Sequence, residues 1–171
     1  MFSKVDQFLD QISIDTEFEL DSGFQLAFLF QHRGDEPKAM ELGFKLREKY
    51  YNDTEAHSRY IAMFLHREQS KVELFVKEKV EYGTVIVLKD EHDNKYVYKI
   101  VNTKEPRRER EEIGPEDQLT IELLGKNVND VILSSEGTIG ADKRTIIEIK
   151  SKYVHAFHET LEYADKHPGS I

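Results

Sequence analysis

The stretch IGPEDQLTIELLGKNVNDVI, residues 113–132, decides the fold of the C-terminal half of this chain. Asp117 suits the N-cap of a short helix, because its carboxylate can accept a hydrogen bond from a free N–H of the first turn. Apolar residues then recur at helical spacing and predict one buried helix face, formed by Leu119, Leu123 and Leu124 with Ile121 beside them. Gly125 stands where a chain leaving a helix commonly adopts a positive φ. The pattern therefore predicts a short capped helix followed by a turn.

A strand is predicted directly after that turn. Asn129 and Asp130 are turn residues, and they lead into the apolar run Val131, Ile132 and Leu133. A short apolar run bounded by a turn is typical of a buried strand, so we expect these residues to belong to the core.

The order of these features resembles the C-terminal domain of the bacterial Gre transcript-cleavage factors, the GreA/GreB family. That family typically reads I-S-x-D-S-P-hydrophobic-A-R-x-L-L/I-G-K-x-x-x-D-x-V here. The chain matches this motif without a gap at Ile113, Leu119, Leu123, Leu124, Gly125, Lys126, Asp130 and Ile132. The Asp-Ser-Pro segment of the family is replaced by Glu116, Asp117 and Gln118, so an acid is kept and the proline is absent.

Both flanks of the motif extend the resemblance to residues 80–150, roughly half the chain. Upstream, GTVIVLKDEHDNKYVYKIV (83–101) is similar to the hairpin of the family, with strands expected at 84–88 and 96–101 around a polar turn. Downstream, RTIIEI (144–149) takes the place of its closing strand.

The resemblance implies a fold and a partner. The Gre C-terminal domain is FKBP-like, a curved antiparallel sheet wrapped on a short helix, and it docks on the rim of the secondary channel of bacterial RNA polymerase. Glu116, Asp117 and Gln118 are then the polymerase-binding residues. Leu119, Leu123, Leu124, Gly125 and Asp130 are the structural part of the motif.

The N-terminal half is predicted to be helical. Apolar spacing and turn residues indicate helices over 3–12, 23–32, 37–50 and 55–67, with Asp21-Ser22 as a cap for the second and Pro37 in the first turn of the third. The order of large and small side chains resembles a tetratricopeptide repeat at Leu26, Ala27, Phe30 and Ala39. The alternative is a small helical domain without repeat ancestry.

We therefore predict an α+β chain with four parts. A TPR-like helical domain spans 1–70, a linker spans 71–82, the Gre-like FKBP-like domain spans 83–150, and a C-terminal helix and tail span 151–171. The apolar pattern of the linker fits either a strand or a helix.

The net charge, the apolar runs and the cysteine content limit what kind of molecule this chain can bind. The formal net charge of −9 argues against direct nucleic-acid binding, which relies on clustered basic residues. No apolar run approaches a membrane span, and the N-terminus lacks the pattern of a secretory signal. The absence of cysteine excludes disulfides and thiolate sites and fits a cytoplasmic location. We expect a protein partner instead.

No catalytic or cofactor motif accompanies the fold signals. His155 and His158 stand three apart on the last predicted helix, without the further ligands of a metal site. The long coiled coil through which Gre factors promote transcript cleavage is missing, because the helices are short and broken by turns. The leading hypothesis is a non-catalytic polymerase-binding module, with the helical half as an adaptor for a further protein. The alternatives are an FKBP-like prolyl isomerase, using Tyr96, Tyr98 and Tyr153, and a scaffold unrelated to polymerase.

Overall fold

The computed structural model of the chain describes residues 4–67, 71–134 and 142–167. It divides into two compact units, each with its own core. The first unit combines Met1–Lys71 with Ala156–Ile171, and the second consists of Val72–His155. The predicted tail beyond residue 167 lies outside the described residues, as do the ends of the predicted helical domain at 1–3 and 68–70.

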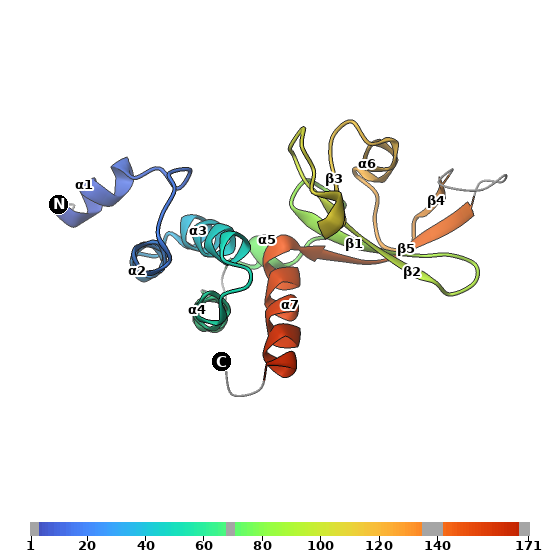
Figure 1. Cartoon of the computed structure of the whole chain (residues 1–171). Helices are drawn as coiled ribbons and strands as arrows, with labels where there is room; N and C mark the ends of the chain where they lie inside the picture. The colour runs from blue at the N-terminus through green and yellow to red at the C-terminus, as the bar shows by residue number, and fades with distance from the viewer. Residues whose placement is uncertain (1–3, 68–70, 135–141, 168–171) are drawn as a thin grey trace. The chain divides into compact units, whose positions relative to one another are not determined.

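Among the described residues, four helices and most of a fifth belong to the first unit; Figure 1 labels them. They are α1 (Lys4–Gln11), α2 (Leu20–His32), α3 (Glu36–Lys49), α4 (Thr54–Leu65) and α7 (Lys152–Lys166). Helix α2 begins at Leu20, so Asp21 lies in its first turn and does not cap it as predicted. Asp53 does cap α4, because its carboxylate accepts a hydrogen bond from the Glu55 N–H at 2.8 Å.

Small residues let the helices of the first unit approach closely. A Cβ built on Gly23 of α2 would lie 2.6 Å from a Leu46 methyl carbon of α3. Large side chains fill the remaining space, and Phe24, Phe30 and Tyr60 are fully buried. Leu65, the last residue of α4, is 64% exposed.

The last helix contributes both polar and apolar contacts to this unit. Its buried residues there are Ala156 and Thr160, and Arg47 of α3 donates a hydrogen bond from Nε to the Thr160 hydroxyl at 3.2 Å. The Phe157 ring stacks on Phe64 of α4 at 4.2 Å. The segment after the sheet is therefore part of the helical core.

A five-stranded sheet and a short helix form the second unit. Its strands are β1 (Thr84–Lys89), β2 (Lys95–Ile100), β3 (Glu112–Ile113), β4 (Val131–Ser134) and β5 (Asp142–Ser151), in the order β3-β2-β1-β5-β4. The pairings of β1 with β2, β1 with β5 and β4 with β5 are antiparallel, while β2 pairs with β3 in parallel. The sheet is mixed because the chain after β2 returns through the short helix η1 (Arg108–Arg110) and runs alongside β2.

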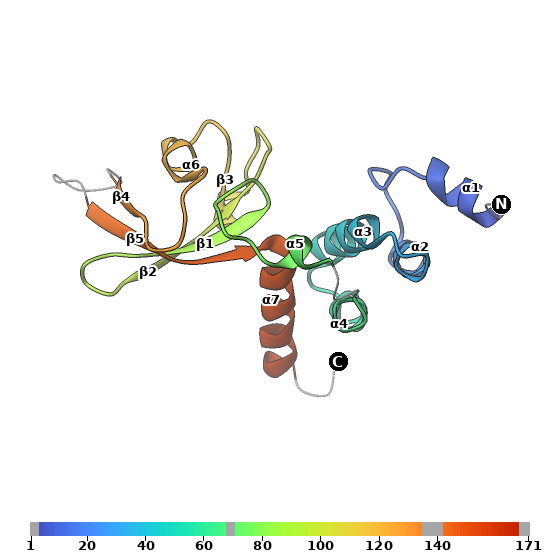
Figure 2. The same cartoon turned by 180° about the vertical axis from the view of Figure 1, so that it is seen from behind.

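The core of this unit lies on one face of the sheet, which helix α6 (Gln118–Leu123) covers (Figure 2). Strand alternation brings Ile86, Leu88, Ile100, Ile132 and Ile146 to that face, where they pack against Leu119 and Leu123. The predicted α+β fold is confirmed: a helical N-terminal part is followed by a sheet with one short helix.

The predicted linker contains regular structure. Helix α5 (Val72–Phe75) is a single turn, and Lys79 forms an isolated antiparallel bridge with Asn127. The ring of Phe75 meets Tyr153 edge to face at 6.3 Å. The segment before β1 is thus attached to the second unit at two points.

Candidate protein-binding loop

The loop that the motif singles out runs from Ile113, the last residue of β3, to Gln118, the first residue of α6. The loop needs glycine at position 114, because a Cβ there would lie 2.7 Å from the Thr103 carbonyl oxygen. That oxygen belongs to the backbone and cannot swing away as a flexible side chain does. The loop therefore lies directly against the segment that follows β2.

Asp117 occupies the N-cap position, as predicted, with φ −74° and ψ 129°. Its carbonyl accepts the first helical hydrogen bond, from the Ile121 N–H at 3.1 Å. The predicted side-chain cap is wrong, because the carboxylate points back into the loop instead of toward the first turn. It accepts a hydrogen bond from the Gly114 N–H at 2.5 Å, and it forms an ion pair with Arg108.

Glu116 and Gln118 flank Asp117 and are exposed. Gln118 donates from its side-chain amide to the Glu122 carboxylate at 2.9 Å, one helical turn on. Glu116 is one of the residues that line a small pocket of about 170 Å³, which are Thr103, Lys104, Pro106, Arg108, Gly114, Glu116 and Asp117. The loop thus presents a carboxylate beside two basic side chains.

Two arginines of the segment between β2 and β3, Arg107 and Arg108, hold the loop in place. Arg108 reaches Asp117 across nine positions of sequence, and Arg107 pairs with the Glu112 carboxylate of β3, which is buried. Burial raises the pKa of Glu112, but the hydrogen bonds from Arg107 outweigh it and hold the pKa of that carboxyl below its ordinary value. Only the return of the chain along β2 brings its arginines to the site.

The structural residues of the motif have identifiable roles. Gly125 adopts φ +81°, as predicted for the residue that ends a helix, and its N–H donates to the Val80 carbonyl at 2.8 Å. The Asp130 carboxylate accepts from the Asn127 N–H at 2.7 Å and closes the turn before β4. Leu119 and Leu123 are buried, and Leu124 packs partly against the same core.

Two details of the predicted core are wrong. Ile121 is 58% exposed, and Thr120 takes the inward position of that turn. The buried strand at 131–133 is half correct: Ile132 is buried, but Val131 and Leu133 are 43% and 64% exposed. Successive side chains of β4 alternate between the two faces of the sheet, and only Ile132 lies on the face that packs against the core.

The residues considered for other activities lie apart from this loop. Tyr96 and Tyr98 of β2 pack against the sheet core, with the Arg144 guanidinium 4.1 Å above the Tyr96 ring, whereas Tyr153 contacts Phe75. Within the described residues, no three of the histidine, aspartate and glutamate side chains are grouped as a metal site would require. No helix in that part of the chain is long and apolar enough to cross a membrane.

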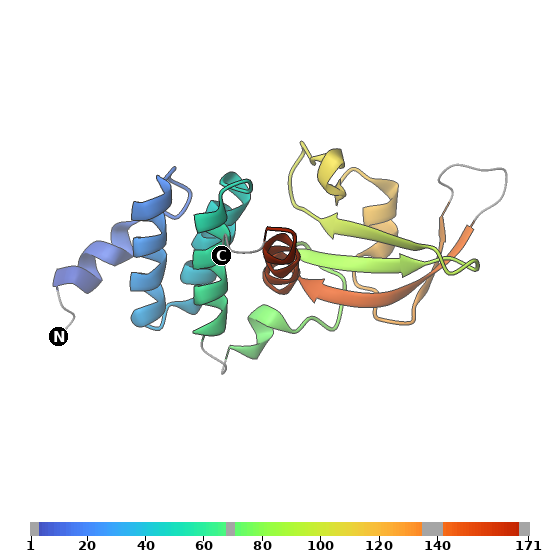
Figure 3. The same ribbon diagram turned by 60° about the horizontal axis from the view of Figure 1, so that its bottom comes forward.

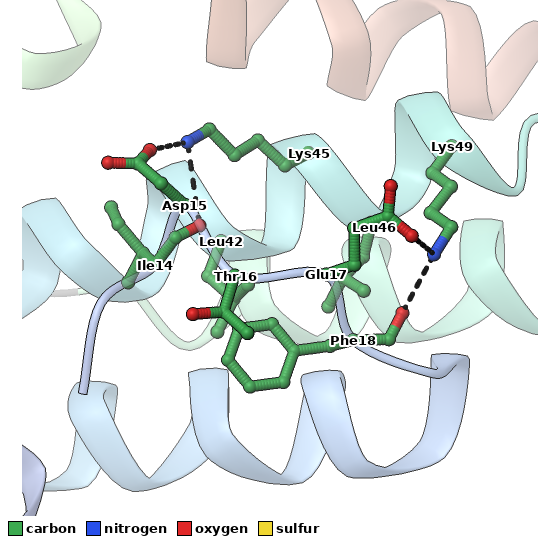
Figure 4. A pocket seen from close by; sticks show the side chains of 9 residues that line it. All are labelled: Ile14, Asp15, Thr16, Glu17, Phe18, Leu42, Lys45, Leu46 and Lys49. Carbon is green, nitrogen blue, oxygen red and sulfur yellow. Dashed lines mark hydrogen bonds and ion pairs between the residues drawn. The ribbon is translucent and has the colours of Figure 1, made fainter.

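A second pocket, of about 260 Å³, lies in the first unit between residues 14–18 and helix α3 (Figure 4). Lys45 bonds the Asp15 carboxylate at 2.6 Å, and Lys49 donates to the Phe18 carbonyl at 3.2 Å. Leu42 and Leu46 form its apolar wall. The two lysines fasten the segment between α1 and α2 onto α3.

Comparison with known proteins gives structural similarities alone: neither a family model nor a curated protein matches the chain. A solved structure of the prokaryotic transcription elongation factor GreA/GreB from Nitrosomonas europaea matches at 17% identity and a TM-score of 0.40, over 48% of this chain and 66%, just under two thirds, of that chain. The GreA factor homolog 1 (Gfh1) of Thermus thermophilus matches at 14% identity and a TM-score of 0.37, over 75% of this chain and 95% of that chain. Thermus aquaticus Gfh1 matches at 17% identity and a TM-score of 0.39, over 75% and 94%.

Proposed function

We propose that this chain is a non-catalytic, RNA polymerase-binding module of a transcription elongation factor-like protein. In this proposal the loop at 113–118 contacts the polymerase and the helical unit serves as an adaptor for a further protein. The observation that carries it is the exposed Glu116 carboxylate in a loop that is held at Gly114 and Asp117.

The matched motif residues separate into two groups. Leu119, Leu123 and Ile132 fill the core, and Gly125 and Asp130 shape turns, so these matches are explained by folding alone. Glu116 has no such structural duty, since it is exposed and the loop is held by its neighbours. An acidic side chain in this place suits a basic protein surface, which is the kind of contact that the Gre resemblance implies.

The loop can present this charge without the proline of the family. The Asp117 carboxylate accepts a hydrogen bond from the Gly114 N–H and forms an ion pair with Arg108. These contacts fix the backbone on either side of Glu116. A preordered loop loses less conformational entropy on binding, so a single well-placed carboxylate contributes more.

The test is a binding titration of the full chain with bacterial core RNA polymerase at two salt concentrations. We expect Glu116→Lys to weaken binding, with the larger effect at low salt, because reversing a charge at the rim of an interface places like charges together. Glu91→Lys, at an exposed position in the β1–β2 turn, makes the same charge change and should bind as the parent does. Parent-like binding by Glu116→Lys at both salt concentrations would refute this contact.

A second readout tests the non-catalytic part of the proposal. A stalled polymerase should show no added transcript cleavage at saturating protein. Cleavage that requires this protein would show that acids elsewhere in the chain reach the polymerase active site.

A further inference from the structure

Residues 14–18, between α1 and α2, lie along one face of α3 and belong to no helix or strand (blue in Figure 3). The α3 residues beneath them recur at helical spacing, so they form a single stripe. Two of them are buried leucines, and two are lysines one helical turn apart. We call this stripe and the C-cap residue that follows it the α3 face: Leu42, Lys45, Leu46, Lys49 and Tyr50.

The first lysine of the α3 face holds the start of the segment. Lys45 donates to the Asp15 carboxylate at 2.6 Å and to the Ile14 carbonyl oxygen at 3.5 Å (Figure 4). One contact is with a side-chain charge and the other is with the backbone. Lys45 therefore recognises both an acidic residue and the path of the chain before it.

The second lysine holds the end of the segment in the same way. Lys49 and the Tyr50 hydroxyl both donate to the Phe18 carbonyl oxygen, each at 3.2 Å. Lys49 also lies 3.6 Å from a carboxylate oxygen of Glu17 (Figure 4). In all these contacts α3 and its cap supply the donors and the segment supplies the acceptors, which is how a basic surface binds an acidic peptide.

The segment is held loosely for a part of the chain that covers buried leucines. None of residues 14–18 is buried, and the side chains of Asp15 and Glu17 are 81% and 91% exposed. Ion pairs to such exposed carboxylates contribute little to stability. A segment with few buried contacts can leave its place at a low cost in free energy, without unfolding of the unit.

The segment also fills its place incompletely. A pocket of about 260 Å³ lies between residues 14–18 and α3, with Leu42 and Leu46 in its wall. Well-packed interiors leave few voids larger than a water molecule. A segment with bulkier apolar side chains would therefore cover more of the α3 face than residues 14–18 do.

We propose that the α3 face binds an acidic segment of a partner protein, and that residues 14–18 occupy this site in the free chain. The partner segment would carry the pattern of Ile14–Phe18: two carboxylates two positions apart, with an apolar side chain on either side. Its carboxylates would replace Asp15 and Glu17 at the two lysines. The site lies in the helical unit and is separate from the Glu116 loop.

The first experiment weakens the occupancy of the site by the chain's own segment. Asp15→Asn with Glu17→Gln removes both carboxylates in the full chain, and we call this the released variant. A fluorescein-labelled peptide of residues 13–19, SIDTEFE, should bind it about fivefold or more tightly than it binds the parent, because the tethered segment competes at a high effective concentration. Glu162→Gln with Asp165→Asn, at exposed positions of α7, changes the net charge equally and should bind the peptide as the parent does.

The second experiment removes the cations of the α3 face. In the released variant, Lys45→Gln with Lys49→Gln should weaken peptide binding about tenfold or more at low salt, because both peptide carboxylates lose their partners. Lys95→Gln with Lys143→Gln, two exposed lysines of the sheet unit, makes the same charge change and should bind within about twofold of the released variant. Circular dichroism checks that each variant is folded.

The third experiment changes the peptide instead of the protein. SINTQFE lacks the two carboxylates, and SSDTESE lacks the two apolar side chains. Each should bind the released variant about tenfold more weakly than SIDTEFE. A loss with both peptides shows that the site recognises charge and apolar surface together.

Four outcomes would overturn the proposal. They are no binding of SIDTEFE to the released variant, equal affinity of parent and released variant, and unchanged binding after removal of the two lysines. The fourth is a dimer of the released variant in sedimentation that the peptide dissociates, since a second copy of this chain would then be the occupant. Loss of polymerase binding by Glu116→Lys has no bearing on these results, so the two proposals can fail independently.

Discussion

The imidazole of His57 lies flat on the ring of Tyr163, with 4.0 Å between the ring centroids and 9° between their planes. Its Nε2 lies 2.6 Å from the Tyr51 carbonyl oxygen, and its Nδ1 lies 3.1 Å from the Thr160 hydroxyl. A carbonyl can only accept, so Nε2 carries the proton and neutral Nδ1 accepts from Thr160. Arg47 donates to the same hydroxyl oxygen. This chain of hydrogen bonds joins α7 to α3 and α4.

The docking of α7 should therefore weaken in mild acid. Burial lowers the pKa of His57, and the charge of Arg47 lowers it further, against opposing effects of the Tyr51 carbonyl, Glu159 and Glu48. Because the folded pKa is below the ordinary value of 6.5, the unfolded chain binds the proton more readily. The stability conferred by neutral His57 is fully present above 6.5 and is lost as the pH falls below that value through the folded pKa.

The measurement is the free energy of unfolding of the parent and of His57→Gln between about pH 7.5 and 5.5, the range in which histidine titrates. The parent should lose more stability than the variant over this range. Parallel pH profiles would show that His57 does not control the acid sensitivity of the helical unit.

Leu123→Ala should destabilise the sheet unit by about 2–5 kcal/mol, because the side chain is fully buried between α6 and the sheet. Ile121→Ala, two positions earlier in the same helix, removes an exposed side chain and should change stability by less than about 1 kcal/mol. Chemical denaturation of both variants compares the two. Equal losses would mean that α6 does not bury the face described.

The contrast between these two residues also shows how far the sequence could predict the site. Leucine spacing and Gly125 located α6 and its end, because helical periodicity and a positive φ are local properties. Ile121 was assigned to the core because a helix of six residues is too short for its pattern to separate a buried face from an exposed one. Thr120 is buried in its place, and a threonine is not hydrophobic enough for the apolar pattern to predict its burial.

Long-range pairing accounts for most of the remaining differences. The predicted cap at Asp117 assumed that its carboxylate had no better donor than the first turn. In the structure, the carboxylate has two better donors, the Gly114 N–H and the Arg108 guanidinium. The position of Arg108 depends on how the loop after β2 folds back, which no local sequence pattern predicts. The same holds for Arg47, whose burial and contact with Thr160 join residues 113 positions apart.

Asp117 should now be tested as a brace of the loop. Asp117→Ala removes both the Gly114 hydrogen bond and the Arg108 ion pair, and we expect a loss of about 0.5–2 kcal/mol, similar to that of a helix cap. Asp117→Asn keeps an acceptor for the Gly114 N–H and loses only the charge. Since the Arg108 side chain is 61% exposed, the Asn variant should lose less than about 1 kcal/mol.

Thermal or urea unfolding of the two variants distinguishes the contacts. If Asp117→Asn is as unstable as Asp117→Ala, the ion pair with Arg108 is the main contact, and the Gly114 hydrogen bond is secondary.

Gln118→Pro restores the proline of the Gre motif at the first residue of α6, and the backbone there is already suited to it. Asp117 has φ −74° and ψ 129°, the extended conformation that a residue before proline prefers. The N–H at the first helical position has no partner within the helix, so its loss costs little. We expect stability within about 1 kcal/mol of the parent, and tighter polymerase binding if a stiffer loop is better ordered for Glu116.

Two further variants control for the side chain and for the position. Gln118→Ala removes the hydrogen bond to Glu122 without adding a ring, and Glu122→Pro removes the same bond while placing proline inside the helix, where it should cost about 3 kcal/mol or more. Unfolding and polymerase titration of the three variants give the comparison. If Gln118→Pro unfolds as readily as Glu122→Pro, residue 118 lies within the helix, and the loop that carries Glu116 ends earlier than described.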